Sequence, residues 1–129
     1  MVMQYLLGFR RLEYQVVFVE QLQESSLVPA HASLEASANA AYFKTVMAEC
    51  DLTHASSLML RRSEATVGLS RDAVRDIAKS ADALINISGW LDDPELTSDI
   101  PVRVYIDVDP GFTQLWQAVD VIDMRFGDH

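Results

Sequence analysis

Asp107 and Asp109 are the residues whose type and spacing could do chemistry most directly. They lie in the stretch Val102–Trp116, VRVYIDVDPGFTQLW, where an alternating apolar run meets an acidic turn and then an amphipathic segment. Side chains two residues apart in extended backbone project to the same side, so the two carboxylates could grip one hard cation. The alternative is structural: Asp109 caps the following helix and Asp107 bonds the neighbouring loop. We favour the structural interpretation and predict no metal site, because turns of this kind select Asp for local reasons alone.

Two further sets of polar residues follow predicted strands. The segment INISG places Asn86 and Ser88 at the end of one strand, and Gly89 would let a ligand approach the backbone. Glu20 ends an earlier apolar run and could hydrogen-bond a sugar hydroxyl, although a solvated carboxylate is the commoner outcome there. The carboxyl ends of parallel strands form the crevice in which open α/β sheets bind ligands. The function is therefore to be sought at these strand ends.

Other catalytic patterns are absent from the sequence. His31, His54 and His129 are isolated, without the Cys/His spacing that predicts zinc. No Gly-rich phosphate loop, nucleophile elbow or paired catalytic motif is present, and no cofactor is predicted. Whether the chain is an enzyme stays open at this point.

Composition bounds the class of protein. The chain has 129 residues, of which 50% are hydrophobic, enough for one compact domain with a core. Ten Lys and Arg against 19 Asp and Glu give a formal net charge of -9, which would repel nucleic-acid phosphates and anionic lipid. The single cysteine, Cys50, indicates a reduced compartment, and no apolar run suggests a membrane span or a signal peptide. We therefore expect a cytoplasmic protein with no nucleic-acid partner and no membrane span.

The hydrophobic pattern alternates helices with short apolar strands. Helices are predicted over Val2–Glu13 and over Ala38–Cys50, the second with Ser37 as its cap. A third helix is predicted after Ser70, with an inner face formed by Val74, Ile77, Ala78 and Ala81. One helical turn is predicted after Asp93, and a last helix after Asp109, with a buried face formed by Phe112, Leu115, Trp116 and Val119. Strands are predicted over Val16–Glu20, Ser57–Leu60, Ala83–Ser88 and Val102–Val108; Gln21–Ser37 is interpreted as a linker, and the tail Val121–His129 alternates briefly. This order predicts an α/β fold, a Rossmann-like parallel sheet with helices on both faces in a single partial domain over residues 1–129.

Several segments taken together resemble bacterial glycosyltransferase-like proteins of the GT-B fold. They are QYLLGFRRLEYQVVFVE (Gln4–Glu20), TVGLSRDAVRDIAKSADALINISG (Thr66–Gly89) and RVYIDVDPGFTQLW (Arg103–Trp116), followed by IDMRFGDH (Ile122–His129), with NISG and DVDPGFTQ the most specific pieces. The resemblance implies two Rossmann-like halves, the first binding a sugar or glycan acceptor and the second a nucleotide sugar, and it covers only the first half. It further implies that the cleft between the halves is lined by Glu20, Ser88, Gly89, Asp107, Asp109 and Gln114. It assigns no catalytic base.

The same resemblance leads to expectations about completeness and assembly. The family's opening strand and glycine-containing loop would precede the apolar helix that begins at residue 2, and the family continues beyond residue 129. We therefore expect a truncated acceptor-side half-domain that is inactive alone and meets a nucleotide sugar only through a missing C-terminal half. An absent strand would expose a sheet edge and apolar side chains, so we expect a homo-oligomer.

Two other classes of function stay open. Phosphatases of the haloacid dehalogenase type also begin with an apolar strand and Asp-x-Asp, which would make Asp107 the nucleophile and Asp109 the general acid of a small magnesium-dependent phosphotransferase or phosphatase. That family expects Thr or Val two residues after its second Asp, where this chain has Gly111, and little chain remains for its later lysine and acidic pair. A non-catalytic binding module is the third class.

Overall fold

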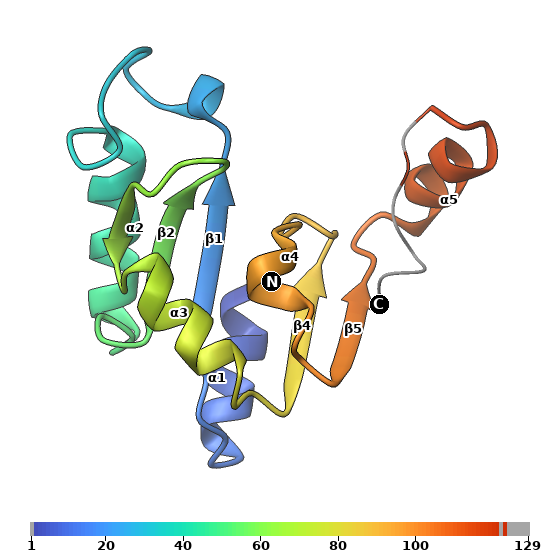
Figure 1. Cartoon of the computed structure of the whole chain (residues 1–129), viewed down its shortest axis with the longest axis horizontal. Coiled ribbons are helices and arrows are strands. Elements are labelled where there is room, and N and C mark those ends of the chain that lie inside the picture. The colour runs from blue at the N-terminus through green and yellow to red at the C-terminus, as the bar shows by residue number, and fades with distance from the viewer. Residues whose placement is uncertain (1, 122, 124–129) are drawn as a thin grey trace. The chain divides into compact units, whose positions relative to one another are not determined.

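The computed structural model describes residues 2–121 and 123, and over these residues the chain is a mixture of helices and short strands. The elements in order are α1 (Val2–Arg11), β1 (Phe18–Leu22), the short 3-10 helix η1 (Glu24–Ser26), α2 (Ala38–Glu49), β2 (Ser56–Leu60), β3 (Thr66–Gly68), α3 (Arg71–Ala78), β4 (Ala83–Ile87), α4 (Pro94–Thr97), β5 (Val102–Ile106) and α5 (Pro110–Ala118) (Figure 1). The predicted α/β class is confirmed. The contacts of the chain group it into two compact units, one ending at Val74 and one beginning at Arg75.

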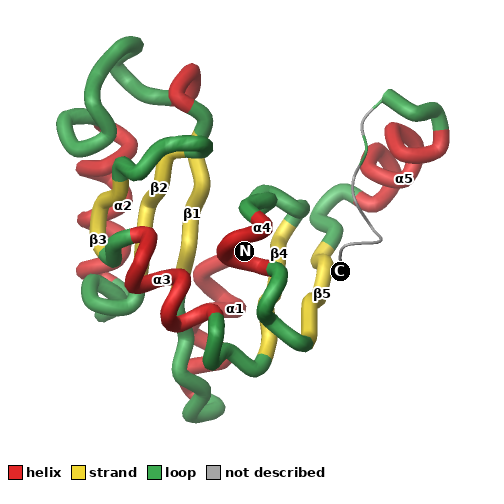
Figure 2. The backbone as a smooth tube through the Cα atoms, in the orientation of Figure 1, coloured by secondary structure: helices red, strands yellow, loops and turns green. Residues whose placement is uncertain are grey.

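The first unit is built on a three-stranded sheet in the order β1-β2-β3 (Figure 2). β1 and β2 are parallel, from Phe18 opposite Ser56 to Leu22 opposite Leu60. β3 is antiparallel to β2, which differs from the all-parallel sheet predicted from the sequence. The reason is the length of the connection: residues 61–65 can turn an antiparallel hairpin, whereas a parallel crossover needs a dozen or more residues.

One face of this sheet carries the core of the first unit. All five side chains of β2 are buried. Alternation along the strand places Phe18, Glu20 and Leu22 on one face of β1, and on that face Phe18 stacks on Phe43 of α2 with ring centroids 6.2 Å apart. The core consists of Leu6 of α1 together with Leu27, Leu34, Ala40, Phe43, Met47, Leu52, Leu58, Leu60 and Val67. α1, α2 and the sheet are therefore held by one shared apolar cluster.

Residues 21–37, predicted as a linker, are an integral part of the first unit. Leu27 and Leu34 are each only 3% exposed and belong to the core. The side chain of Asn39 in α2 anchors the segment, because its Oδ1 accepts a hydrogen bond from the Val28 N–H at 2.9 Å. The polar composition of the segment predicted a linker because its two leucines are isolated in the sequence. Burying each leucine side chain stabilises the fold by about 1.5–3 kcal/mol.

The predicted starts of three helices are confirmed. The Ser37 hydroxyl accepts a hydrogen bond from the N–H three residues on at 3.1 Å, and the Ser70 hydroxyl does the same at 3.2 Å. The Asp93 carboxylate accepts from the N–H two residues on at 3.0 Å, with Pro94 in the first turn of α4. Each of these side chains satisfies a backbone donor that the first turn of a helix leaves unpaired.

The second unit contains the parallel pair β4–β5, with Ala83 opposite Val102 and Ile87 opposite Ile106. The predicted burial of the apolar residues after Asp109 is wrong: Phe112, Leu115, Trp116 and Val119 are between 40% and 56% exposed. Val102 and Val104 of β5 and Val108 after it are also between 41% and 52% exposed. Amphipathic spacing identifies the apolar side of an element without identifying what covers it. The predicted alternating tail, apart from residues 121 and 123, lies outside the described residues.

Among the described residues, no helix combines the length and apolarity needed to cross a membrane.

Candidate functional site

The carboxyl ends of β4 and β5 lie next to each other in the second unit. Ile87 is opposite Ile106, and the Ser88 N–H donates a hydrogen bond to the Ile106 C=O at 2.9 Å. Ser88 and Asp107 are the next residues of the two strands, so the structure brings them to one edge of the sheet. This is the arrangement that parallel pairing predicts for residues at strand ends.

The loop after β4 is shaped by Asn86, Ser88 and Gly89. Ser88 has φ 58° and Gly89 φ 67°, a left-handed conformation that is uncommon for serine and easy for glycine. Asn86 is 4% exposed; its Nδ2 donates to the Leu91 C=O at 2.8 Å, and its Oδ1 accepts from the Leu91 N–H at 3.3 Å. Asn86 therefore closes the loop, and Ser88 and Gly89 are held half-buried at the sheet edge.

The turn after β5 is held by Asp107 and Thr113. Asp107 Oδ1 accepts hydrogen bonds from the Asp109 N–H at 3.0 Å and from the Thr113 hydroxyl at 2.9 Å. Thr113 is 5% exposed, and its hydroxyl also lies 2.9 Å from the Asp109 C=O. The predicted local role of Asp107 is thus confirmed.

Asp109 does not play the part predicted for its side chain. It occupies the position before α5, but its carboxylate makes no capping hydrogen bond. The Asp107 side chain, two residues earlier, already accepts the hydrogen bond of the Asp109 amide. Asp109 is exposed, as is Gln114 in α5.

Charge and burial also act on the residues beside Asp107. Burial raises the pKa of the Tyr105 hydroxyl, and the negative charge of Asp107 raises it further. Tyr105 thus stays a neutral phenol that can donate a hydrogen bond.

Among residues 2–121 and 123, no group of three or more His, Cys, Asp or Glu side chains is placed to hold a metal ion.

Glu20 belongs to the first unit, whereas the other five predicted site residues belong to the second. It lies in the middle of β1, opposite Leu58, and not at the end of the strand as predicted, because the strand continues to Leu22. Alternation places Glu20 between Phe18 and Leu22 on the core-facing side of the sheet. Burial there raises the pKa of its carboxyl group.

A pocket that sequence reasoning missed lies at the carboxyl ends of β1 and β2. It has a volume of about 360 Å³ and is lined by Gln23, Glu24, Ser25, Arg61 and Arg62. The Arg61 N–H donates a hydrogen bond to the Leu22 C=O at 2.8 Å, so the backbone pairing of β1 and β2 continues to the first residue of the loop after β2. The available signal was the pair of arginines directly after the apolar run of β2.

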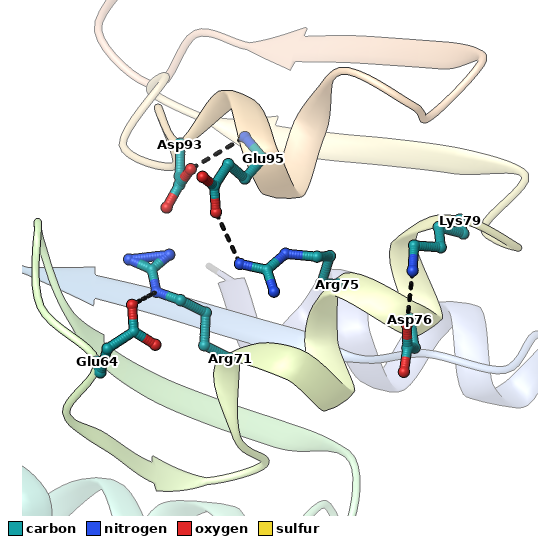
Figure 3. Close-up of polar contacts among 7 residues, drawn as sticks. All are labelled: Glu64, Arg71, Arg75, Asp76, Lys79, Asp93 and Glu95. Carbon is teal, nitrogen blue, oxygen red and sulfur yellow. Dashed lines mark hydrogen bonds and ion pairs between the residues drawn. The ribbon is translucent and has the colours of Figure 1, made fainter.

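Several charged side chains of α3 and α4 form ion pairs (Figure 3). In the second unit, Arg75 Nη2 lies 2.7 Å from Glu95 Oε2 and Lys79 Nζ lies 2.8 Å from Asp76 Oδ1. In the first unit, Arg71 Nε lies 3.7 Å from Glu64 Oε1. These contacts are structural, and we assign no ligand to them.

None of the models of known protein families, the curated protein sequences or the solved structures compared with this chain matches it.

Proposed function

We propose that this chain is the acceptor-side, Rossmann-like half-domain of a GT-B glycosyltransferase-like protein, and that it binds a sugar or glycan acceptor at the carboxyl ends of β4 and β5. The observation that carries the proposal is the pairing of Ser88 with Ile106, which sets NISG and DVDPGFTQ side by side. These are the two most specific pieces of the family resemblance. They are far apart in sequence and meet at the kind of edge where open α/β sheets bind ligands.

The groups at this edge suit a neutral, hydroxyl-rich ligand. The exposed Asp109 carboxylate and the second oxygen of Asp107 can accept hydrogen bonds from sugar hydroxyls, and the Ser88 hydroxyl can both donate and accept. Gly89 has no side chain and lets a ring approach the backbone. Gln114 of α5 offers an amide of the same hydrogen-bonding type.

The family resemblance assigns the nucleotide sugar to a second half, so the proposal includes binding without transfer by this chain alone. A cytoplasmic location and self-association belong to the same proposal. Self-association is supported by the exposed apolar side chains of β5 and α5, including Phe112, Leu115 and Trp116, because apolar patches on protein surfaces mark interaction sites.

Sugar binding is tested by following the backbone amide signals of the chain by NMR while neutral mono- and disaccharides are added. We expect saturable shifts at Ser88, Gly89 and Asp107. Asp107→Asn keeps the Oδ1 acceptor of the turn but removes the charge, and should weaken binding about tenfold. Asp82→Asn, the same change at the opposite end of β4, is the matched control and should leave binding unaltered.

Two results would contradict the proposal. Equal weakening by the variants at positions 82 and 107 would show that the sugar does not bind at the carboxyl edge. Transfer of a sugar from UDP-glucose by the isolated chain would contradict the inactivity. Magnesium-dependent hydrolysis of an aryl phosphate that Asp107→Asn abolishes would favour the phosphotransferase alternative, although one oxygen of Asp107 is already engaged by the turn.

A further inference from the structure

We propose that the pocket at the carboxyl ends of β1 and β2 binds an oxyanion group, phosphate or carboxylate, carried by a small metabolite. The pocket belongs to the first unit and the proposed sugar-binding edge to the second. The two proposals therefore rest on different residues, and either can fail without the other.

The position of the pocket supports a ligand site. β1 and β2 are parallel and end level with each other, Leu22 opposite Leu60, so the loops that follow them leave the same edge of the sheet. The hydrogen bond from the Arg61 N–H to the Leu22 C=O fixes the base of both loops. This edge is where open α/β sheets bind ligands, and a volume of about 360 Å³ is at the small end of the range for small-molecule sites.

The charge of the pocket selects the ligand class. Arg61 and Arg62 are consecutive, in a chain whose formal net charge is -9. β2 ends at Leu60, and both arginines lie in the turn that follows it, where Arg62 has φ 57°. Both arginines line the same pocket. Guanidinium groups bind phosphate and carboxylate through paired hydrogen bonds, and Ser25 and Gln23 add a hydroxyl and an amide donor.

The side chain of Arg62 is available to a ligand. Other basic side chains lie beside acidic partners, as in the pairs Arg10–Asp51 and Lys44–Glu35 and in the pairs Arg71–Glu64, Arg75–Glu95 and Lys79–Asp76 that Figure 3 shows. Arg62 is exposed and makes no hydrogen bond or ion pair with any residue of the described part of the chain. Glu24 is the one acidic group of the pocket lining, and its charge opposes an anion.

The test uses three ligands that share one ring: phenyl phosphate, benzoate and benzyl alcohol. Each is added to the full chain while backbone amide signals are followed by NMR. We expect saturable shifts at residues 23–25 and 61–62 with phenyl phosphate or benzoate and none with benzyl alcohol. The tighter of the two anions identifies the oxyanion. A neutral sugar should not shift these signals, which separates this site from the edge of the second unit.

Variants of opposite sign sharpen the test. Arg62→Gln should weaken anion binding about tenfold, because it removes a charge-assisted pair of hydrogen bonds. Glu24→Gln should tighten it, because it removes a like charge. Arg103→Gln makes the same change in net charge on exposed β5 and should leave the affinity within about twofold. The absence of saturable shifts with both anions, equal shifts with benzyl alcohol, or equal weakening by the variants at positions 62 and 103 would overturn the proposal.

Discussion

Asp107, and not Asp109, is expected to stabilise the turn between β5 and α5. Its Oδ1 accepts two hydrogen bonds, at 3.0 Å from the Asp109 N–H and at 2.9 Å from the Thr113 hydroxyl. A hydrogen bond to a charged group contributes about 1.5–3 kcal/mol and solvent weakens it, so for this half-buried carboxylate we expect Asp107→Ala to cost about 2 kcal/mol. Asp107→Asn keeps the acceptor and should cost less than about 1 kcal/mol. Asp109→Ala removes a carboxylate that makes no capping bond and should change the free energy of unfolding by less than about 0.5 kcal/mol.

Urea unfolding followed by tryptophan fluorescence measures this order. Both tryptophans, Trp90 and Trp116, belong to the second unit, so the fluorescence reports on the unit that contains the turn. Hydrogen exchange of the Asp109 amide gives a local check and should accelerate in Asp107→Ala only. Equal destabilisation by the alanine variants at 107 and 109 would refute the reasoning, because it would mean that the Asp109 carboxylate caps α5.

Two further predictions concern the first unit. Ser57 Oγ donates to the Leu69 C=O at 2.7 Å, whereas the buried Ser56 Oγ has no hydrogen-bond partner among the described residues. In matched urea titrations, Ser57→Ala should therefore lower the free energy of unfolding by about 1–2 kcal/mol, and Ser56→Ala should leave it unchanged or raise it by up to about 1 kcal/mol. An equal decrease in both variants would contradict the difference in hydrogen bonding. Burial raises the pKa of the Glu20 carboxyl group in the folded chain, so the folded chain binds the carboxyl proton more tightly than the unfolded chain does. The free energy of unfolding therefore falls as the pH rises from 4.5, the ordinary pKa of this group, through its raised folded-state pKa. Glu20→Gln should be more stable than the unsubstituted chain at about pH 7.5 and should lose that advantage at about pH 4, and an advantage equal at both pH values would exclude the charge as its cause.

The parts of the fold that the sequence predicted well are those with local causes. The caps at Ser37, Ser70 and Asp93 bond an amide only two or three residues away, so the chemistry that starts each helix is contained in one short segment. The strand from Ala83 was placed to within one residue because an apolar run ends there at the left-handed pair Ser88 and Gly89. Local pattern is sufficient where the competing structures differ locally.

The features that the sequence missed depend on distant partners. β3 has only three residues, too few to show a hydrophobic pattern, and it forms because it pairs with β2. At the end of β3, Gly68 has φ 92°, and a Cβ atom there would lie 2.3 Å from the Ser56 carbonyl oxygen, so only glycine fits. The predicted buried face of α5 is wrong, since Phe112 and Trp116 are 56% and 40% exposed whereas Thr113 is 5% exposed. Spacing indicates which side of a helix is apolar, and only tertiary packing decides whether that side is covered.

One strand boundary explains why the sequence led to Glu20 and not to the arginine pocket. If β1 ended at Glu20, that carboxylate would lie at the ligand-binding edge and residues 23–25 would fall in a linker. In the structure Leu22 is opposite Leu60, so β1 ends two residues later than predicted and Glu20 lies within the strand on its core-facing side. Residues 23–25 then follow the strand end and line one pocket with Arg61. The two parallel strand pairs among the described residues thus end in groups of different character: hydroxyl and carboxylate groups follow β4 and β5, whereas the edge after β1 and β2 carries two consecutive arginines from the loop after β2. A neutral sugar and an oxyanion should therefore perturb different units of the same chain, and the two titrations read together decide which edge carries the function.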